Sequence, residues 1–597
     1  MQTSLHSFHI PVMGLAFTVD SPIKVARFGI PSVMSIVEDR LIEMMRKHYY
    51  GSINEKYTPI TTHEPDYRAK RITDYLNLVF KIVNEQIEIL KASAFKAGND
   101  LAKYFEMLPT NNKLRELYFQ MIQSPDGSKK ASLQDYLKSQ IVSGSIDVNI
   151  MTKLDGNNSG NKGVVIEDGT DAVSALRGYA LSALNNSSII FSAGLNPRLF
   201  NYLEKFTTFD ATGLGEFSKK VVIKVSDYRS ALIQGKYLAK KGIWVSEFRL
   251  ESGLNCGGHA FATDGYLMGP ILEEFKNKRE ELITTLHAIY SPAIKAKGKL
   301  AFDSPHPIKI TAQGGIGTAS ENEFILRHYG VDSTGWGTPF LLCPEATTVD
   351  ENTLGLLSKA TKSNINLSNN SPLGVRFHYL KGTTSENEKL TRIESGKPGS
   401  PCTEKHLAFN TEFTTEPICT ASHKYQRLKI EQLKSLNLSE DEFQKQLDNV
   451  YAKECLCVGL SNSASLEYKQ PFLKRLKSVT ICPGPNIAFF SEIVSLQQMT
   501  DHIYGRADIL QREDRPHMFI NELQLYIDYL KEQIELAGEE EKRIQYCIKF
   551  GENMLAGINY YKSLDTVLDT ISSKMALEQA ENQINTMLDC FLIKQKE

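Results

Sequence analysis

The segment IKITAQGGIG, residues 308–317, runs from an alternating, strand-like pattern directly into two adjacent glycines. A second glycine-rich turn, GWGT (335–338), ends the next strand-like segment, VDSTGW (331–336). Glycine lets backbone N–H groups approach an anion closely, and the loops after strands seven and eight of a (β/α)₈ barrel commonly hold a phosphate. The two turns therefore predict a parallel barrel with a phosphate site at its mouth. The alternative interpretation is a pair of tight turns that bind nothing.

The remaining strand pattern agrees with a barrel. Short apolar runs, several of them followed by helical patterns, recur along the first 340 or so residues, and this alternation is typical of α/β architecture. The predicted strands span residues 8–13, 30–36, 146–151, 188–193, 220–225, 243–248, 308–313 and 331–336. Eight strands are the number that closes a parallel barrel. The predicted fold class is therefore α/β, a (β/α)₈ TIM barrel.

The chain is too long for a barrel alone, because such barrels typically have about 250 residues and this chain has 597. Residues 37–145 carry apolar side chains every three or four positions, which predicts a helical insertion after strand two. The barrel would then comprise residues 1–36 and 146–347. Residues 348–597 are predicted to form a large C-terminal extension, irregular over 360–400 and ending in a helical bundle.

Composition excludes some classes of function. The formal net charge is −2, and charges of both signs are mixed, so binding to nucleic acid or to an anionic membrane surface is not expected. There is no signal-peptide pattern and no window of 18 apolar residues. Nine cysteines, an odd number at low density, fit reduced thiols and predict a cytoplasmic protein. Their spacing matches no common zinc or iron–sulfur pattern, so no metal is predicted.

The segment SGLNCGGH, residues 252–259, is a candidate catalytic turn at the end of the sixth predicted strand. Gly257 and Gly258 would let a flat ring lie against the backbone, with His259 facing that ring. Histidine has the pKa range that general acid/base chemistry needs near neutral pH. The alternative is a buried, hydrogen-bonded histidine on a structural turn. We favour the catalytic interpretation because the phosphate turns lie at the same face of the predicted barrel.

Three segments together resemble the nitronate monooxygenase family, which includes the flavin-dependent enoyl-ACP reductases. They are NCGGH (255–259), AQGGIG (312–317) and GWGTPFLLCPEA (335–346). Four further segments agree in order, namely PVMGLAFTVDSPIKVARFG (11–29), VNIM (148–151), SAGLNP (192–197) and VVIKVSDYRSA (221–231). The resemblance covers roughly residues 8–36 and 146–347. The helical insertion and the last 250 or so residues lie outside it.

The resemblance implies that FMN binds at the barrel mouth. Its phosphate would meet the backbone amides of Gly314, Gly315, Gly337 and Thr338, and Gly335 and Trp336 of the second turn would also contact the cofactor. Its ring would lie near Met13, Asn149, Lys224, Gly257 and Gly258. Lys224 would stabilise negative charge on the reduced ring, or would instead reach solvent or pair with an acid inside the barrel. His259 would act as general acid or base.

Departures from the family pattern leave the reaction open. Ser252 and Asn255 stand where the family often carries Gln and Glu, and Pro339 stands where it carries Arg. The first candidate is a nitronate monooxygenase that oxidises a small anionic substrate with O₂. The second is an enoyl reductase that uses NAD(P)H and an acyl thioester. The third is a flavin-binding scaffold subunit without turnover.

Overall fold

The computed structural model describes residues 4–151, 155–159, 165–192, 194–471, 476–510, 515–538, 540–564, 568 and 570–594. Eight parallel strands form one sheet in the order β1-β12-β11-β10-β9-β6-β3-β2. They are β1 (Phe8–His9), β2 (Ser32–Ser35), β3 (Ile146–Ile150), β6 (Ser187–Phe191), β9 (Lys219–Val225), β10 (Val245–Glu251), β11 (Lys309–Gln313) and β12 (Ser333–Gly335). Each predicted strand is present, so the predicted fold class is confirmed.

A short backbone link between the first and second strands closes the barrel. Ile10 and Ser32 form a parallel bridge next to β1 and β2, and the Val33 N–H donates to Ile10 O at 2.9 Å. Val33, Ile190 and Val222 pack together as one small buried cluster, while apolar residues on the other faces of the strands pack against the outer helices. Closure gives hydrogen-bond partners to backbone groups at the edges of β1 and β2, which would otherwise be exposed and unpaired.

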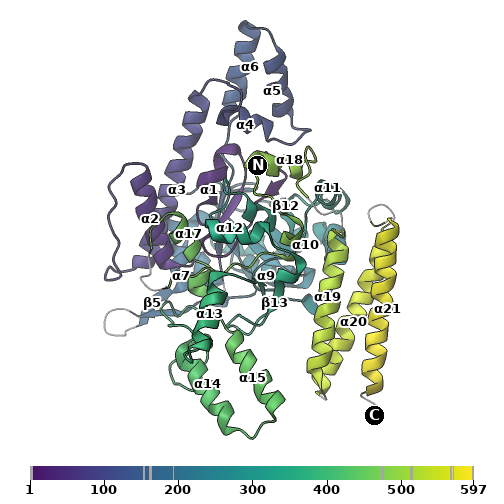
Figure 1. Ribbon diagram of the computed structural model, residues 1–597. Coiled ribbons are helices and arrows are strands. Elements are labelled where there is room, and N and C mark those ends of the chain that lie inside the picture. Colours follow the sequence, from purple (N-terminus) through teal and green to yellow (C-terminus); the bar gives the residue numbers. More distant parts are fainter. Residues whose placement is uncertain are drawn as a thin grey trace.

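Helices surround the barrel, all but the last of them between successive strands (Figure 1). They are α1 (Ser21–Val25), α7 (Asp171–Leu181), α8 (Pro197–Tyr202), α9 (Tyr228–Lys240), α10 (Met268–Ala296), α11 (Ala319–His328) and α12 (Glu351–Ser358). Two-stranded hairpins, β4–β5 (Asn157–Ser159 and Val165–Thr170) and β7–β8 (Ala211–Gly213 and Glu216–Phe217), decorate the connections.

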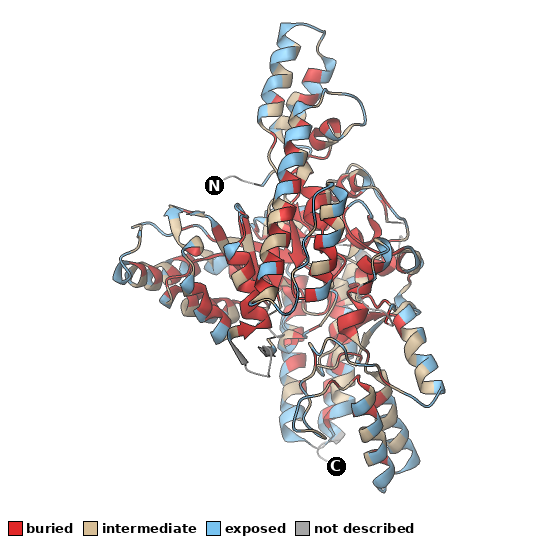
Figure 2. Ribbon diagram, turned by 90° about the vertical axis from the view of Figure 1, so that its left-hand side faces the viewer, coloured by how far each residue is buried: buried red, intermediate tan, exposed pale blue. Residues whose placement is uncertain are grey.

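The helical insertion between β2 and β3 contains α2 (Asp39–Ser52), α3 (Tyr67–Ala92), α4 (Asp100–Glu106), α5 (Lys113–Gln123) and α6 (Ser128–Ser139). The helix α3 packs closely along α7, and the contact leaves no room for a side chain at Gly178 of α7, which would lie only 2.8 Å from Ile72 of α3. In Figure 2 the α3 end near the barrel is buried, whereas the tip formed by α5 and α6 is largely exposed. The insertion is therefore anchored on the barrel by α2 and α3.

The C-terminal extension is more ordered than its composition predicts. Residues 360–400, expected to be irregular, contain the antiparallel hairpin β13 (Ile365–Ser368) and β14 (Phe377–Leu380) and the helix α13 (Thr384–Glu394). The expectation was wrong because the apolar run PLGVRFHYL supplies a strand that is buried along its whole length.

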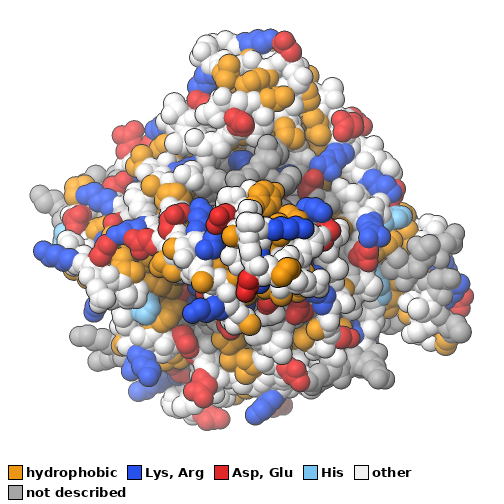
Figure 3. Space-filling model, turned by 90° about the horizontal axis from the view of Figure 1, so that it is seen from above, with side chains coloured by type: hydrophobic (Ala, Val, Ile, Leu, Met, Phe, Trp, Pro, Cys, Tyr) orange, Lys and Arg blue, Asp and Glu red, His pale blue; other side chains and the backbone are white. Residues whose placement is uncertain are grey.

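The rest of the extension is mainly helical, as predicted (Figure 1). It contains α14 (His423–Ser435), α15 (Glu440–Ala452), α16 (Leu456–Gly459), α17 (Asn462–Glu467), α18 (Leu496–Ile503), α19 (Met518–Ala537), α20 (Glu541–Lys562) and α21 (Ile571–Lys594). The last three pack together beside the barrel. No described helix is long and apolar enough to cross a membrane. Seen from above, acidic and basic side chains are interspersed over the surface (Figure 3).

Candidate functional site

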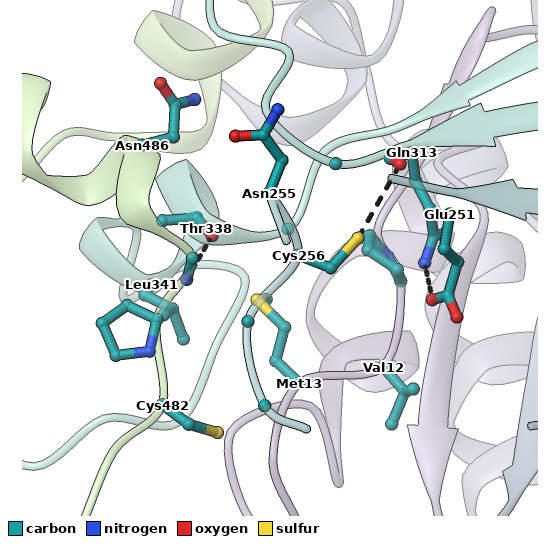
Figure 4. Close-up of a pocket in the computed structure, with 18 of the residues that line it drawn as sticks. Val12, Met13, Glu251, Asn255, Cys256, Gln313, Thr338, Leu341, Cys482 and Asn486 are labelled. Carbon is teal, nitrogen blue, oxygen red and sulfur yellow. Dashed lines mark hydrogen bonds between the residues drawn. The ribbon is translucent and has the colours of Figure 1, made fainter. Parts of the chain in front are cut away.

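A cavity of about 120 Å³ lies at the barrel mouth (Figure 4). Loops that follow β1, β10, β11 and β12 supply most of its lining, and the ends of strands such as β9, with Lys224, and residues 481–486 of the C-terminal extension supply the rest. Nine of the twelve residues predicted from sequence line it, namely Met13, Lys224, Gly257, Gly258, Gly314, Gly315, Gly335, Gly337 and Thr338. The fold therefore brings together segments that are more than 300 residues apart in the chain.

Two glycine turns present unpaired backbone donors to this cavity. The N–H groups of Gly314, Gly315, Gly337 and Thr338 donate no hydrogen bond to any residue in the described part of the chain. Thr338 begins the short helix η5 (Thr338–Leu342), whose first N–H groups have no partner within the helix. A concave group of unpaired N–H donors is the arrangement that binds anions.

The N-terminus of α11, in contrast, is already occupied. Glu321 accepts hydrogen bonds from the N–H groups of Gly317 and Thr318 at 2.8 and 3.2 Å, completing a capping box. Burial raises the pKa of Glu321, but the Arg515 guanidinium, His517 and the Gly317 N–H together lower it below its ordinary value. Since Glu321 already supplies a negative charge here, the helix dipole is not free to bind a second anion.

Arg515 ties the C-terminal extension to the first glycine turn. Its guanidinium contacts Glu321 at 2.7 Å and donates to Gly315 O at 2.8 Å.

We expect Arg515→Met to lower the free energy of unfolding by about 3 kcal/mol or more, because it leaves Glu321 buried without its partner. Urea denaturation measures this effect, and adding Glu321→Gln should recover part of it. The control is Arg543→Met in an exposed pair with Glu540, where a loss above about 1 kcal/mol would contradict the assignment to burial.

Packing also requires glycine at both positions of the first glycine turn. Gly314 and Gly315 have φ angles of +110° and +80°. A side chain at Gly314 would lie 2.7 Å from Cys256 Sγ, and one at Gly315 would lie 2.6 Å from Asn255 Nδ2. The turns after β10 and β11 therefore pack directly against each other, which explains why Asn255 and Cys256 adjoin the cavity (Figure 4).

The opposite wall carries a charged group that is already paired. Lys224 Nζ lies 3.1 Å from Glu251 Oε1, and the Gln313 amide donates to the same oxygen at 2.6 Å. The structure thus realises the alternative in which Lys224 pairs with an acid inside the barrel. Burial raises the pKa of Cys256 and raises that of Cys482 to about 12. Both thiols stay protonated near neutral pH, so neither is a ready nucleophile.

Three predicted residues lie outside the cavity lining. The Asn149 side chain is buried on β3, and its Oδ1 has no hydrogen-bond partner among the described residues. The Trp336 indole is buried, with Nε1 3.4 Å from Asn322 Oδ1 and its ring edge-on to His502. The second turn therefore offers the cavity its glycines and Thr338, while Trp336 points into the core.

His259 is held by the C-terminal extension rather than presented to the cavity. Its Nε2 lies 2.7 Å from Ser371 Oγ, and its ring packs edge-on against Phe377. The backbone on either side pairs with β14, since the Ala260 N–H donates to Arg376 O and the His378 N–H donates to Gly258 O. This contact was not foreseen, because β14 lies more than 100 residues further along the chain.

The segment Ile481–Asn486 covers one side of the cavity. The Gly258 N–H donates to Cys482 O at 3.1 Å, and the Gly484 N–H donates to Thr338 Oγ1 at 3.0 Å. A side chain at Gly257 would lie 2.3 Å from Cys482 O. Sequence reasoning missed this cover: the run CPGPN signals a turn, but nothing local indicates where that turn docks.

A buried carboxyl group of α19 supports the turn after β10. Glu522 accepts from Ser252 Oγ at 2.6 Å and from the Met268 N–H at 3.0 Å. Burial raises the pKa of Glu522 to about 7. Ser252 therefore contacts this acid from the C-terminal bundle.

This shift predicts a pH dependence of stability. A folded-state pKa above the unfolded value contributes stability that is fully present below about pH 4.5 and is lost as pH rises through 7. Glu522→Gln cannot titrate. Between pH 5 and 8 its free energy of unfolding should therefore rise relative to that of the wild type, by on the order of 3 kcal/mol for the shift described. Thermal unfolding across that range measures the gain, with Glu535→Gln on the exposed face of α19 as control. Parallel profiles for Glu522→Gln and wild type would contradict the shift.

Comparisons with known proteins do not assign the chain to a family. No family model matches it, and no curated protein matches it. One similar solved structure is the enoyl reductase domain of MlnA from the macrolactin biosynthesis cluster of Bacillus amyloliquefaciens. Its TM-score is 0.31 and its sequence identity is 14%, over 74% of this chain and 95% of that chain. A likeness of this size carries no argument about function, which is therefore proposed from the site.

Proposed function

We propose that the chain binds FMN at the barrel mouth and acts as an oxidoreductase. The observation that carries this proposal is the convergence of unpaired N–H groups from the turns after β11 and β12 on one cavity. In (β/α)₈ barrels these two loops are the common place for a phosphate. Gly314, Gly315, Gly337 and Thr338 would hold the phosphate of the cofactor.

The cavity fits the phosphate of FMN better than it fits the complete flavin. The donor set fits a phosphate, because it offers several N–H groups and no carboxylate of its own. The volume of about 120 Å³ is below the roughly 300–1,000 Å³ of pockets that enclose drug-sized ligands. Cys482 and Gly484 occupy space beside Gly257. Binding of a complete flavin therefore requires residues 481–484 to shift away from Gly257.

When bound, FMN supplies the electron transfer, and the protein supplies position and charge. The first candidate reaction remains the oxidation of a small nitronate by O₂, with enoyl reduction by NAD(P)H as the alternative. Lys224, with Glu251 and Gln313, would set the charge beside the ring. The third candidate, flavin binding without turnover, is favoured by the cover over Gly257 and by the contact of His259 with Ser371.

Titration of the purified full chain with FMN, riboflavin and FAD tests the binding step. We expect FMN to bind, and riboflavin to bind at least about 100-fold more weakly, because it lacks the phosphate. Equal affinity for riboflavin, or no binding of FMN, would overturn the proposal. Turnover is then measured with an alkyl nitronate and O₂, and with NADPH and an enoyl thioester. Flavin binding with neither activity selects the scaffold interpretation.

A further inference from the structure

A second cluster of polar groups lies where the barrel meets the C-terminal extension, away from the residues that line the cavity described above. Glu38 follows β2 directly and is the N-cap of α2, and Asp171 is the first residue of α7. Glu404 and His406 come from the loop between α13 and α14. The carboxyl end of the barrel and the extension thus contribute residues to one place.

Three potential ligand atoms in this cluster have no hydrogen-bond partner. They are Glu38 Oε1, Glu404 Oε1 and His406 Nε2, each buried and without a hydrogen bond among the described residues, although Glu38 and His406 face each other as an ion pair at 3.8 Å. Glu38 is only 2% exposed, and its other oxygen caps α2 at the Leu41 N–H. Glu404 Oε1 has Arg40 at 3.2 Å, but that side chain is 47% exposed and lacks hydrogen-bond geometry. Buried polar atoms without hydrogen bonds are costly, and a shared ligand would satisfy all three at once.

The separation of these groups suits a shared cation. Glu38, Glu404 and His406 each offer one ligand atom within 4.8 Å of the others, and His406 Nε2 lies 3.8 Å from Glu38 Oε1. That distance is too long for a hydrogen bond. Two ligands that each lie about 2.1 Å from one ion are roughly 3–4 Å apart. The gap therefore matches a bridging ion better than a direct contact.

The second ring nitrogen of His406, Nδ1, faces a carboxylate. Asp171 Oδ2 lies 3.6 Å from His406 Nδ1, and Arg68 Nε lies 3.4 Å from Asp171 Oδ1. Metal-bound histidines usually direct their second ring nitrogen toward a carboxylate, which fixes the ring orientation. Asp171 lies on the correct side of the ring to be that positioning residue, at an ion-pair distance rather than a hydrogen-bond distance.

We propose that Glu38, Glu404 and His406 form a binding site for one divalent transition-metal ion. An imidazole with two carboxylates favours Zn²⁺ or Mn²⁺ over Mg²⁺ and Ca²⁺, which prefer oxygen ligands alone. Asp171, Glu404 and His406 also line a cavity of about 950 Å³. Three protein ligands beside a cavity leave coordination positions for water or a small molecule. The site is independent of flavin binding, so either proposal can fail alone.

Titration of the chelator-treated full chain with Co²⁺, a spectroscopic substitute for Zn²⁺, tests the site. We expect one Co²⁺ per chain, with d–d absorption and without the charge-transfer band of a cobalt thiolate. A thiolate band would show that cysteines bind the ion and would overturn the assignment. Absence of binding would overturn it too, leaving His406 as a protonated side chain between Glu38 and Asp171.

Variants separate ligation from folding. His406→Gln and Glu404→Gln should each lose at least about 100-fold in Co²⁺ affinity, and Asp171→Asn about 10–100-fold. The matched control is His63→Gln, an exposed histidine of the insertion, which should bind Co²⁺ as the wild type does. Thermal unfolding without metal identifies variants that fail to fold. A folded His406→Gln and a folded Glu404→Gln that both bind Co²⁺ normally would overturn the proposal.

Discussion

Gly337→Asp should abolish FMN binding at ordinary concentrations, with a loss of roughly 10³-fold in affinity. The new carboxylate would stand in the turn after β12, beside the proposed phosphate position. Two unit charges of the same sign about 4 Å apart repel by about 4 kcal/mol at an effective dielectric constant of 20, which corresponds to about 10³-fold. Fluorescence titration with FMN measures the loss.

The backbone at Gly337 makes this substitution a clean test. Its φ of −100° is accessible to any residue, and a Cβ would lie 3.5 Å from Met13 and 3.2 Å from Pro11, a close contact that a shift of a few tenths of an ångström would relieve. Gly337→Ala carries the same Cβ without the charge and should keep FMN affinity within about tenfold. Gly315 is a poorer choice, because its φ of +80° and its contact with Asn255 would strain any side chain. Normal FMN affinity in Gly337→Asp would place the phosphate elsewhere.

His259→Ala should reduce turnover by about 10²–10⁴-fold while flavin remains bound, if His259 is the acid or base of the reaction. The two glycine turns follow β11 and β12 and would hold the cofactor without it. The expectation requires that the imidazole exchange its contact with Ser371 for one with the substrate. Flavin stoichiometry and kcat, measured on the same preparation, test it.

Ser371→Ala distinguishes a catalytic His259 from a structural one. It removes the hydrogen bond between Ser371 and His259 but leaves the imidazole and the packing against Phe377 in place. A catalytic role predicts that Ser371→Ala retains most of the turnover that His259→Ala loses. Equal, small losses in both variants, together with lower thermal stability, would identify His259 as a residue that fastens the extension to the barrel.

Much of the fold could be predicted from local sequence. The apolar run KVVIKV predicts a strand, and most side chains of that strand, β9, are buried. In α3 the apolar residues recur every three or four positions and form the buried face of the helix. The glycine turns after β11 and β12 carry their own conformational signal, since Gly314 and Gly315 adopt positive φ angles. These features depend on neighbours within a few residues, so the sequence alone predicts them.

The site could be predicted only in part. The parallel topology places every loop after a strand at one mouth, and this brought nine of the twelve expected residues to one cavity. The directions of the other three side chains depend on packing partners. Trp336 points to Asn322 and His502, and His259 meets Ser371. No periodicity encodes such contacts.

By itself, the sequence determined the eight strands, the helical insertion and the two glycine turns, because each follows from short-range periodicity or backbone conformation. Only the tertiary structure decided what surrounds those turns. Glu522 reaches Ser252, Cys482 covers Gly257, and Glu404 and His406 meet Glu38 across hundreds of residues. The cause is physical: buried polar groups must find partners wherever the folded chain offers them, and sequence separation places no limit on where those partners lie.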